Sequence, residues 1–235
     1  MMRLDKFLTE LEIGSRSEVK GYIKKGQVTV NGKTCKSNDE KIDEWNDCIC
    51  FRGQELIYQK FRYYMLNKPL GVVTATRDDK EKTVMDLLNG VNKKDLAPVG
   101  RLDKDTEGLL LITNDGLLAH TLLSPKKHVD KTYRVGLLKE IKEEDMVLLE
   151  KGVDIGDEKI TLPARAVMIT PKEILLTIHE GRFHQVKRML EAVNNKVVSL
   201  KRESFGSLKL DCRLESGGFR ELTMDEIESL TKDAM

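Results

Sequence analysis

Several features that would assign a chain to a broad class of protein are absent from this sequence. No stretch of its 235 residues approaches the ~18 consecutive apolar residues of a membrane span, and its first residues contain no apolar signal core. Net charge is only +1, from 40 basic and 39 acidic residues, so overall charge says nothing about a nucleic-acid partner. We therefore expect a cytoplasmic protein with no membrane partner, and its ligands must be inferred from local patterns.

Cysteine is scarce, and the usual cofactor motifs are missing. The four cysteines are Cys35, Cys48, Cys50 and Cys212. Their spacing fits neither a zinc pattern nor a disulfide framework, so we expect reduced, buried thiols. The sequence has no Walker loop and no Gly-x-Gly-x-x-Gly motif after a strand. We therefore expect no metal site and no cofactor.

What the sequence does contain is a series of short helices and strands. Residues 3–25 are predicted to form two helices, with Ser15 or Ser17 capping the second and Gly26 ending it. The pair Asn31-Gly32 predicts a hairpin turn after a strand at 28–30. Later helices are predicted at 83–88, 117–123, 141–151 and 225–230, and strands at 63–66, 72–73, 109–112, 131–135, 164–169, 173–178, 197–202 and 207–210. Because strands and helices do not alternate strictly, the predicted class is α+β with a mixed, largely antiparallel sheet.

Two domains are predicted, at 1–58 and 62–235, joined by a linker near 57–62. The first is locally basic: residues 3–37 contain eight basic and four acidic side chains, a difference of +4. The exposed cations expected on its second helix and hairpin are Arg16, Lys20, Lys24, Lys25 and Lys33. Such a surface can follow RNA phosphates. On charge alone, an ordinary solvated helix face remains the alternative.

A charged loop followed by an apolar run, at residues 100–116, is the most distinctive stretch of the second domain. Leu109 to Ile112 read as a buried strand closed by Asn-Asp-Gly. Asp103 therefore lies in a loop that a core strand anchors, with Arg101 two residues before it. A carboxylate in this setting is a candidate reacting group. From spacing alone, an Asp at such a position is more often part of a turn or a helix cap than a catalyst.

The motifs of the second domain resemble those of the pseudouridine synthases of the RsuA/RluA superfamily. They are Gly100-Arg101-Leu102-Asp103 with Thr106 and Gly108-Leu109-Leu110, Asn67-Lys68-Pro69-Leu70-Gly71, Lys131-Thr132-Tyr133, and Gly181-Arg182-Phe183-His184-Gln185. The resemblance implies that Asp103 is the catalytic residue, that Arg182 is its basic partner, and that Tyr133 stacks on the target base. It also implies that Arg101 fills the space left by a flipped nucleotide. Lys187 and Arg188, on the helix after Arg182, are expected to contact phosphates, and His184 is given no catalytic role.

The first domain is similar to the S4 RNA-binding domain. The similarity rests on Arg3-Leu4-Asp5-Lys6-Phe7-Leu8, Ser15-Arg16-Ser17-Glu18 and Gly26-Gln27-Val28-Thr29-Val30-Asn31-Gly32. It favours RNA contact over the solvated-face alternative for the five cations of this domain.

Together the two resemblances imply isomerisation of uridine to pseudouridine in ribosomal RNA. The stretch from Gly181 to Met189, joined to an S4-like domain, is similar to the RsuA branch, which acts on the 16S RNA of the small subunit. A synthase for 23S large-subunit RNA, of the RluB/RluE/RluF type, is the alternative. A non-catalytic S4-type RNA-binding or assembly protein is a rival of another class, and so is a glycoside hydrolase using Asp103 and Asp105. We expect a monomer.

Overall fold

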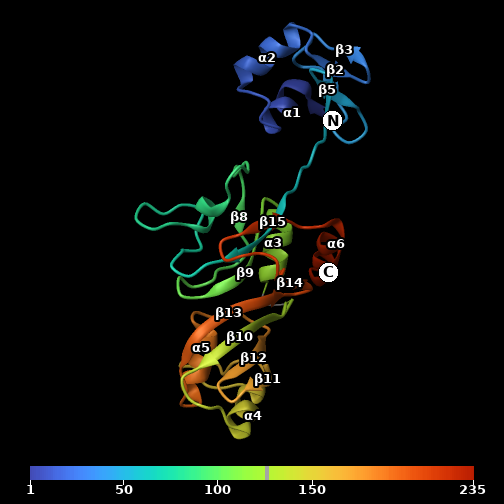
Figure 1. Cartoon of the computed structure of the whole chain (residues 1–235). Helices are drawn as coiled ribbons and strands as arrows, with labels where there is room; N and C mark the ends of the chain where they lie inside the picture. The colour runs from blue at the N-terminus through green and yellow to red at the C-terminus, as the bar shows by residue number, and fades with distance from the viewer. Residues whose placement is uncertain (125–126) are drawn as a thin grey trace. The chain divides into compact units, whose positions relative to one another are not determined.

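The computed structural model describes residues 1–124 and 127–235, which form two compact units, Met1–Lys60 and Phe61–Met235 (Figure 1). No helix in these described ranges is long and apolar enough to cross a membrane. Each unit has its own hydrophobic core, so each is described by itself.

The first unit packs two helices, α1 (Leu4–Glu10) and α2 (Arg16–Lys24), against short strands. The predicted cap of α2 is confirmed: Ser15 and Glu18 form a reciprocal capping box. The predicted hairpin is also confirmed, since Asn31 and Gly32 both have positive φ, as a two-residue turn of this kind requires. The main sheet runs in the order β3-β2-β5-β6, and a separate pair joins β1 to β4. These strands are β1 (Met2–Arg3), β2 (Val28–Val30), β3 (Lys33–Thr34), β4 (Lys41–Ile42), β5 (Ile49–Phe51) and β6 (Gln54–Leu56).

The cysteine prediction is correct only in part. Cys35 is buried, but Cys48 and Cys212 are exposed and Cys50 is intermediate. All four are free thiols, and the sulfurs of Cys48 and Cys50 lie 3.9 Å apart. Cys50 lies in β5, and Cys48 comes immediately before this strand, where its side chain is exposed.

The second unit is built on a nine-stranded sheet whose main path is β11-β12-β10-β13-β9-β7-β15. β14 pairs with β13, and β8 pairs with β9. Every pairing is antiparallel except β13 with β9, which is parallel. The strands are β7 (Tyr63–Lys68), β8 (Ala97–Pro98), β9 (Glu107–Thr113), β10 (Lys131–Leu137), β11 (Arg165–Thr170), β12 (Glu173–Ile178), β13 (Val197–Phe205), β14 (Leu208–Lys209) and β15 (Phe219–Glu221). The predicted α+β class with a mixed, largely antiparallel sheet is confirmed.

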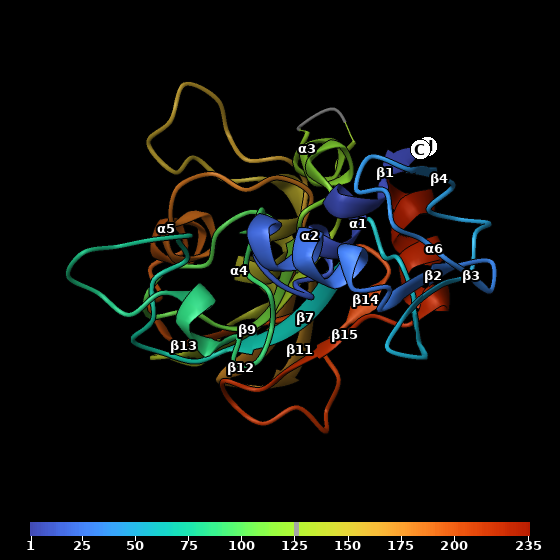
Figure 2. The same ribbon diagram turned by 90° about the horizontal axis from the view of Figure 1, so that it is seen from above.

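Helices cover this sheet on different sides. They are η1 (Val84–Leu87), α3 (Gly116–Leu123), α4 (Glu143–Lys151), α5 (Gln185–Ala192) and α6 (Met224–Asp233). Leu109 and Leu111 of β9 pack with α3 and α6, whereas Leu110 and Ile112 pack in the core that includes η1, α4 and α5. Figure 2 shows α5 and α6 at opposite sides of the view. The apolar run of β9 is thus continuous because both of its faces are buried.

One predicted strand is wrong. Val72 and Val73 follow the turn at Pro69 to Gly71 but form no strand; Val73 makes only an isolated bridge to Thr83. The backbone of Val73 instead bonds Lys82 and Val84, beside the start of η1. A pair of β-branched residues favours extended backbone, but no neighbouring strand is available to extend the pairing.

Two halves of the sheet meet where β13 runs beside β9. Their pairing consists of Lys201 with Glu107 and Arg202 with Gly108. A Cβ atom at Gly108 would lie 2.3 Å from the Arg202 carbonyl oxygen, and its φ of +105° also favours glycine. Gly108 therefore permits this close approach, and it does so five residues after Asp103.

Candidate active site

A buried lysine holds the loop that carries Asp103. Lys68, at the end of β7, is fully buried, and its Nζ donates to the carbonyl oxygens of Asp103 (2.9 Å), Thr106 (2.8 Å) and Pro69 (3.1 Å). Burial lowers the pKa of Lys68 to about 8. In the sequence Lys68 stands out only as part of the motif Asn67-Lys68-Pro69-Leu70-Gly71, and nothing in periodicity reveals that its ammonium cross-links the loop.

Backbone hydrogen bonds fix the rest of the loop. The Thr74 hydroxyl donates to the Leu102 carbonyl at 2.7 Å and accepts from the Leu102 N–H at 3.2 Å. Gly71 N–H donates to the Lys104 carbonyl, and Thr106 N–H to that of Asp103. Because consecutive carbonyls between 102 and 104 are all bonded, the backbone that aims the Asp103 side chain has little freedom to move.

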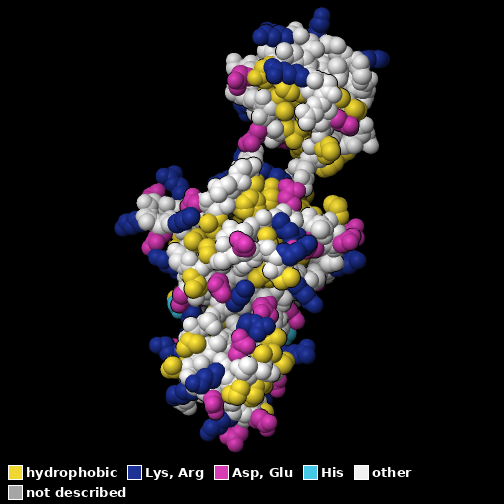
Figure 3. Space-filling model, viewed as in Figure 1, with side chains coloured by type: hydrophobic (Ala, Val, Ile, Leu, Met, Phe, Trp, Pro, Cys, Tyr) yellow, Lys and Arg dark blue, Asp and Glu magenta, His cyan; other side chains and the backbone are white. Residues whose placement is uncertain are grey.

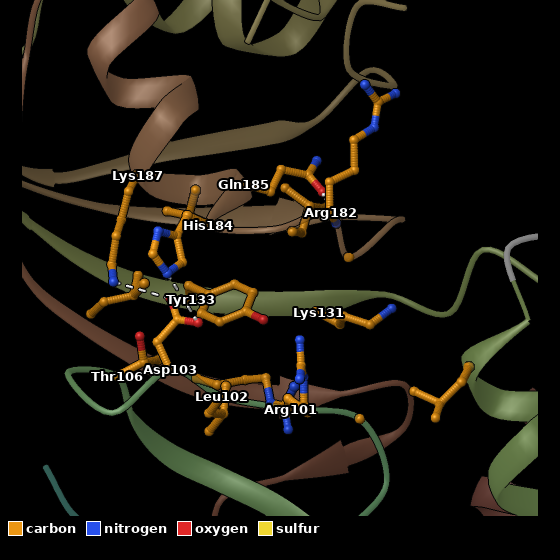
Figure 4. Close-up of a pocket in the computed structure, with 17 residues that line it drawn as sticks. Arg101, Leu102, Asp103, Thr106, Lys131, Tyr133, Arg182, His184, Gln185 and Lys187 are labelled. Carbon is orange, nitrogen blue, oxygen red and sulfur yellow. Dashed lines mark hydrogen bonds and ion pairs between the residues drawn. The ribbon is translucent and has the colours of Figure 1, made fainter. Parts of the chain in front are cut away.

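The cation paired with Asp103 is Lys187, from the first turn of α5. Its Nζ lies 3.1 Å from Asp103 Oδ2 and 2.6 Å from Asp105 Oδ1, as the dashed lines in Figure 4 show for Asp103. Burial opposes the charge of Lys187, but hydrogen bonds to Asp105 and Asp103 outweigh it and raise its pKa. The hydrogen bond from Lys187 lowers the pKa of Asp105 despite its partial burial. This arrangement keeps an ammonium beside the Asp103 carboxylate.

The expected pair of Asp103 with Arg182 is not formed, and this prediction is corrected. Arg182 Nε donates to Glu180 at 2.9 Å, and its Nη atoms donate to the carbonyls of Lys159 and Ile160. It lines the same cavity as Asp103, but its side chain points away from that carboxylate in Figure 4. The two carbonyl acceptors lie more than twenty residues before Arg182, so no local spacing could have predicted them.

Arg188 is likewise engaged by protein groups. It bonds Asp157 at 2.7 Å, the carbonyl of Ile155 at 2.9 Å and that of Phe183 at 2.9 Å. The ion pair with Asp157 raises the pKa of Arg188 and lowers that of Asp157. With Arg182 it fastens residues 155–160 to the turn before α5. The structure thus gives Arg188 a structural role, and its phosphate contact stays a prediction.

Tyr133 shares a cavity of about 130 Å³ with Asp103. Its side chain projects from β10, where Lys131, Tyr133 and Val135 are buried on one face because alternate residues of a strand point the same way. Figure 4 shows the Tyr133 ring and the Asp103 side chain at the same cavity, with Lys131 directed away from Asp103. Arg101 is exposed and lines this cavity too. An aromatic ring beside a carboxylate is a geometry that can hold a planar base near a reacting group.

His184 is a residue that the sequence analysis left without a role. It has φ +49°, a left-handed conformation uncommon outside glycine, at the N-cap of α5. This places its Nε2 3.6 Å from Asp103 Oδ1. Its ring is stacked on that of Phe183 with centroids 3.8 Å apart. The left-handed backbone was the missing information, because an ordinary helical turn would place the ring elsewhere.

The predicted cations of the first unit are in a different setting. Arg16, Lys20, Lys24, Lys25 and Lys33 are all exposed. Across residues 1–124 and 127–235, none of the five has an ion-pair partner within 4 Å. Figure 3 shows Lys and Arg side chains projecting from the surface of this unit. Their charges are therefore available to an anionic ligand.

No group of three or more His, Cys, Asp or Glu residues in the described part of the chain is arranged to hold a metal ion. The chemistry that the cavity can perform with its own residues is that of an aimed carboxylate, Asp103, with an adjacent ammonium, Lys187.

The family model described as RNA pseudouridylate synthase matches residues 62–192, and that of the S4 domain matches residues 2–44. An uncharacterized RNA pseudouridine synthase of Bacillus subtilis, YtzG, is 48% identical, with 98% of this chain and 99% of that protein covered. Ribosomal small subunit pseudouridine synthase A of Escherichia coli is 42% identical, with 97% and 100% covered. A crystal structure of a pseudouridylate synthase is 39% identical, covers 98% of this chain and 100% of its own, and has a TM-score of 0.70.

Proposed function

The chain belongs to the RNA pseudouridylate synthase family and has an S4 domain at its N-terminal side, and from that membership we propose that it converts a uridine of small-subunit (16S) ribosomal RNA to pseudouridine. The observation that carries the proposal is the Asp103 carboxylate, held by a rigid loop, paired with Lys187 and facing a cavity lined by Tyr133. Relatives 42% and 44% identical over nearly their whole length are named ribosomal small subunit pseudouridine synthase A, which supports the choice of subunit.

In the proposed reaction the N1–C1′ bond of the uridine breaks and a C5–C1′ bond forms after the uracil has rotated. N1 ends protonated and C5 loses its proton, so the product is an isomer and no redox partner is needed. Asp103 is the proposed catalytic residue, and the Lys187 ammonium pairs with its carboxylate at 3.1 Å and helps to aim it. Tyr133 provides the ring on which the flipped uracil stacks, and stacking of this kind holds an unpaired base.

The proposed RNA contacts are divided between the two units. The five exposed cations of the first unit, from Arg16 to Lys33, bind phosphates and anchor the ribosomal RNA. Arg101, exposed at the rim of the cavity, takes the space that the flipped nucleotide leaves. Domain limits of 1–58 and 62–235 fit this division of labour. We propose that the protein acts as a monomer in the cytoplasm, on small-subunit RNA that is either free or being assembled into ribosomes.

Two alternatives are distinguished by specific features. A synthase for large-subunit RNA would share the loop of Asp103, and only the names of the relatives favour the small subunit. A non-catalytic RNA-binding protein would have no need of the four hydrogen-bonded carbonyl and N–H groups that hold the Asp103 loop. The intact arrangement around Asp103 supports an enzyme.

A single experiment separates these readings. Unmodified 16S and 23S RNA are each incubated with the protein and no added cofactor, and new pseudouridines are mapped by carbodiimide reactivity. We expect one modified uridine, in the 16S RNA, and none with the Asp103→Asn protein as control. Modification of 23S RNA alone would show that the substrate is large-subunit RNA, as in the alternative. Absence of modification in both RNAs, with RNA binding retained, would support the non-catalytic alternative.

A further inference from the structure

A second cavity, of about 550 Å³, adjoins the Asp103 cavity and shares Lys187 and Leu200 with it. Lys104 and Asp105, the two residues after Asp103, line this second cavity, so one loop serves both. We call it the side groove and define it by Leu70, Lys104, Lys196 and Val198. No predicted role accounts for it.

The apolar walls of the side groove are exposed to solvent. Leu70 is 58% exposed and Val198 is 60% exposed, and neither belongs to a hydrophobic core of its unit. Both are held on fixed backbone: Leu70 lies in the turn that Lys68 and Gly71 tie to the Asp103 loop, and Val198 lies on β13. Branched aliphatic side chains on rigid backbone can pack against the flat face of a base.

The charges of the side groove leave one cation without a protein partner. Three lysines (Lys104, Lys187, Lys196) and two acids (Asp105, Glu191) line it. Asp105 is paired with Lys187 at 2.6 Å, and Lys104 with Glu81 at 2.8 Å. Within the described residues, Lys196 makes no ion pair and its side chain donates no hydrogen bond. The ammonium of Lys196 is therefore available to a phosphate.

We propose that the side groove binds the nucleotide next to the target uridine in single-stranded RNA, with its base against Leu70 and Val198 and its phosphodiester at Lys196. This inference rests on the proposed function, because it assumes that a uridine occupies the Asp103 cavity. Adjacent nucleotides are covalently joined, so a substrate that fills one cavity brings its neighbour to the adjoining one. Lys187 and Leu200 line both cavities, so the two cavities are close enough to hold adjacent nucleotides.

The proposal is tested with a short RNA that contains the uridine mapped on ribosomal RNA. Each neighbour of that uridine is replaced in turn by an abasic nucleotide, which removes the base and keeps the phosphate. For the wild-type protein, one such replacement should lower kcat/KM by about tenfold, the scale of losing apolar contacts from a binding pocket. The Leu70→Ser and Val198→Ser proteins should lose activity on intact RNA and lose little more on that abasic RNA.

Val167→Ser is the matched control, since Val167 is 39% exposed on β11 and lines neither cavity. It should show the full wild-type loss on the abasic RNA. Lys196→Gln should weaken binding to intact and abasic RNA alike, because both retain the phosphate. Two results would overturn the side groove as a nucleotide site while leaving the proposed function intact. One is that kcat/KM does not change with an abasic nucleotide on either side of the uridine. The other is that the losses caused by the abasic nucleotide and by the Ser substitution are fully additive.

Failure of the proposed function is distinguishable from failure of this inference. If the wild-type protein modifies no ribosomal RNA, no target uridine is mapped, and abasic nucleotides are instead placed one at a time along a short single-stranded RNA that the protein binds. The same variants are compared on these RNAs by equilibrium binding. Non-additive losses of affinity at one abasic position would still support the side groove, and additive or absent losses would overturn it. If another protein bound the side groove and RNA did not compete with it, that result would also count against a nucleotide site.

Discussion

The cations predicted to bind RNA in the first unit and the cations around Asp103 in the second unit have opposite environments. In the first unit Arg16, Lys20 and Lys24 are exposed and lack an ion-pair partner in the described parts of the chain. In the second unit Lys68 is fully buried and bonded to three carbonyls, and Lys187 is paired with two carboxylates. Arg182 and Arg188 are bound to carboxylates and carbonyls as well.

This difference separates two uses of the same residue types. An exposed, unpaired lysine contributes long-range attraction to RNA that salt screens, and it tolerates movement. A buried, saturated lysine fixes backbone and side-chain positions at short range, and salt affects it little. Counting basic residues along a sequence cannot distinguish the two, since both regions are rich in Lys and Arg. The predictions below test how far the distinction extends.

Asp103→Asn should have the largest effect, because it removes the charge that Lys187 pairs with and the proposed reacting group itself. We expect isomerisation of ribosomal RNA to be abolished and RNA affinity to stay within about tenfold, since few phosphate contacts are lost. Turnover and equilibrium binding on one RNA are the measurements. Retained turnover above background would show that Asp103 is only a structural residue of its loop.

Lys68→Met should come next. It removes three charge-assisted hydrogen bonds to the Asp103 loop and replaces them by an apolar chain of similar length, which leaves the carbonyls unpaired. Loosening the loop by about 1 Å would lower kcat by on the order of 100-fold. The Lys172→Met protein, which changes an exposed lysine of the same unit, is the control. Near-normal kcat in Lys68→Met would mean that the backbone bonds alone hold the loop.

The pH dependence of activity should also report Lys68. Burial lowers its pKa from 10.5 to about 8. Below pH 8 the Lys68 ammonium is charged in both the folded and the unfolded chain, and the free-energy cost of burying its charge is fully present. Between pH 8 and 10.5 the folded chain loses the proton while the unfolded chain keeps it, so the free energy of unfolding rises with pH. Activity should instead fall as pH rises through about 8, because a neutral amine has only two protons for three carbonyls. Burial and nearby Arg202 lower the pKa of Lys131 to about 8 as well. If the activity of the Lys68→Met protein still fell as the pH rose through about 8, another titrating group would be responsible for the decrease.

Tyr133 offers an intermediate effect that depends on the substitution. Tyr133→Phe keeps the ring and should retain most activity, whereas Tyr133→Leu should lose about 1–3 kcal/mol of base stacking. Because Arg182 bonds residues 159 and 160 and not Asp103, Arg182→Lys should act mainly through stability, and the two losses should be nearly additive. Kinetics of the singles and the double, with thermal denaturation, give the comparison. Strong coupling between the two would place Arg182 at the reacting base after all.

The smallest effects should come from single neutralisations in the first unit, such as Lys24→Gln or Lys33→Gln. Each should weaken RNA binding by about two- to fivefold and reduce the slope of log affinity against log salt by less than one. The value of kcat at saturating RNA should not change. Lys36→Gln, in the segment after the hairpin, provides a comparison at another exposed lysine of this unit. A changed kcat would connect this surface to the chemistry.

Much of the fold was predictable because local signals and global packing agree. Ser15 and Glu18 form the capping box at the start of α2, Asn31-Gly32 makes its turn, and alternate residues of β10 face the core. The position of Asp103 before a buried strand was predictable for the same reason. The partners of Asp103 were not. Lys187 and His184 reach it across more than eighty residues, and the competing partners of Arg182 lie in a separate loop. Long-range pairings of this kind depend on topology and on one left-handed backbone, which spacing does not encode.

The close approach at Gly108 lies where two parts of one sheet meet, and Asp103 and Tyr133 come from different parts. Asp103 belongs to the part formed by β9, β7 and β15, and Tyr133 to the part formed by β10 to β13. Among the described residues, strand pairing joins the parts only between residues 107–108 and 201–202. The distance between the Tyr133 ring and the Asp103 carboxylate therefore depends on how closely β9 and β13 approach each other, and a methyl group at position 108 would push these strands apart. The absence of one side chain thus determines the alignment of two others.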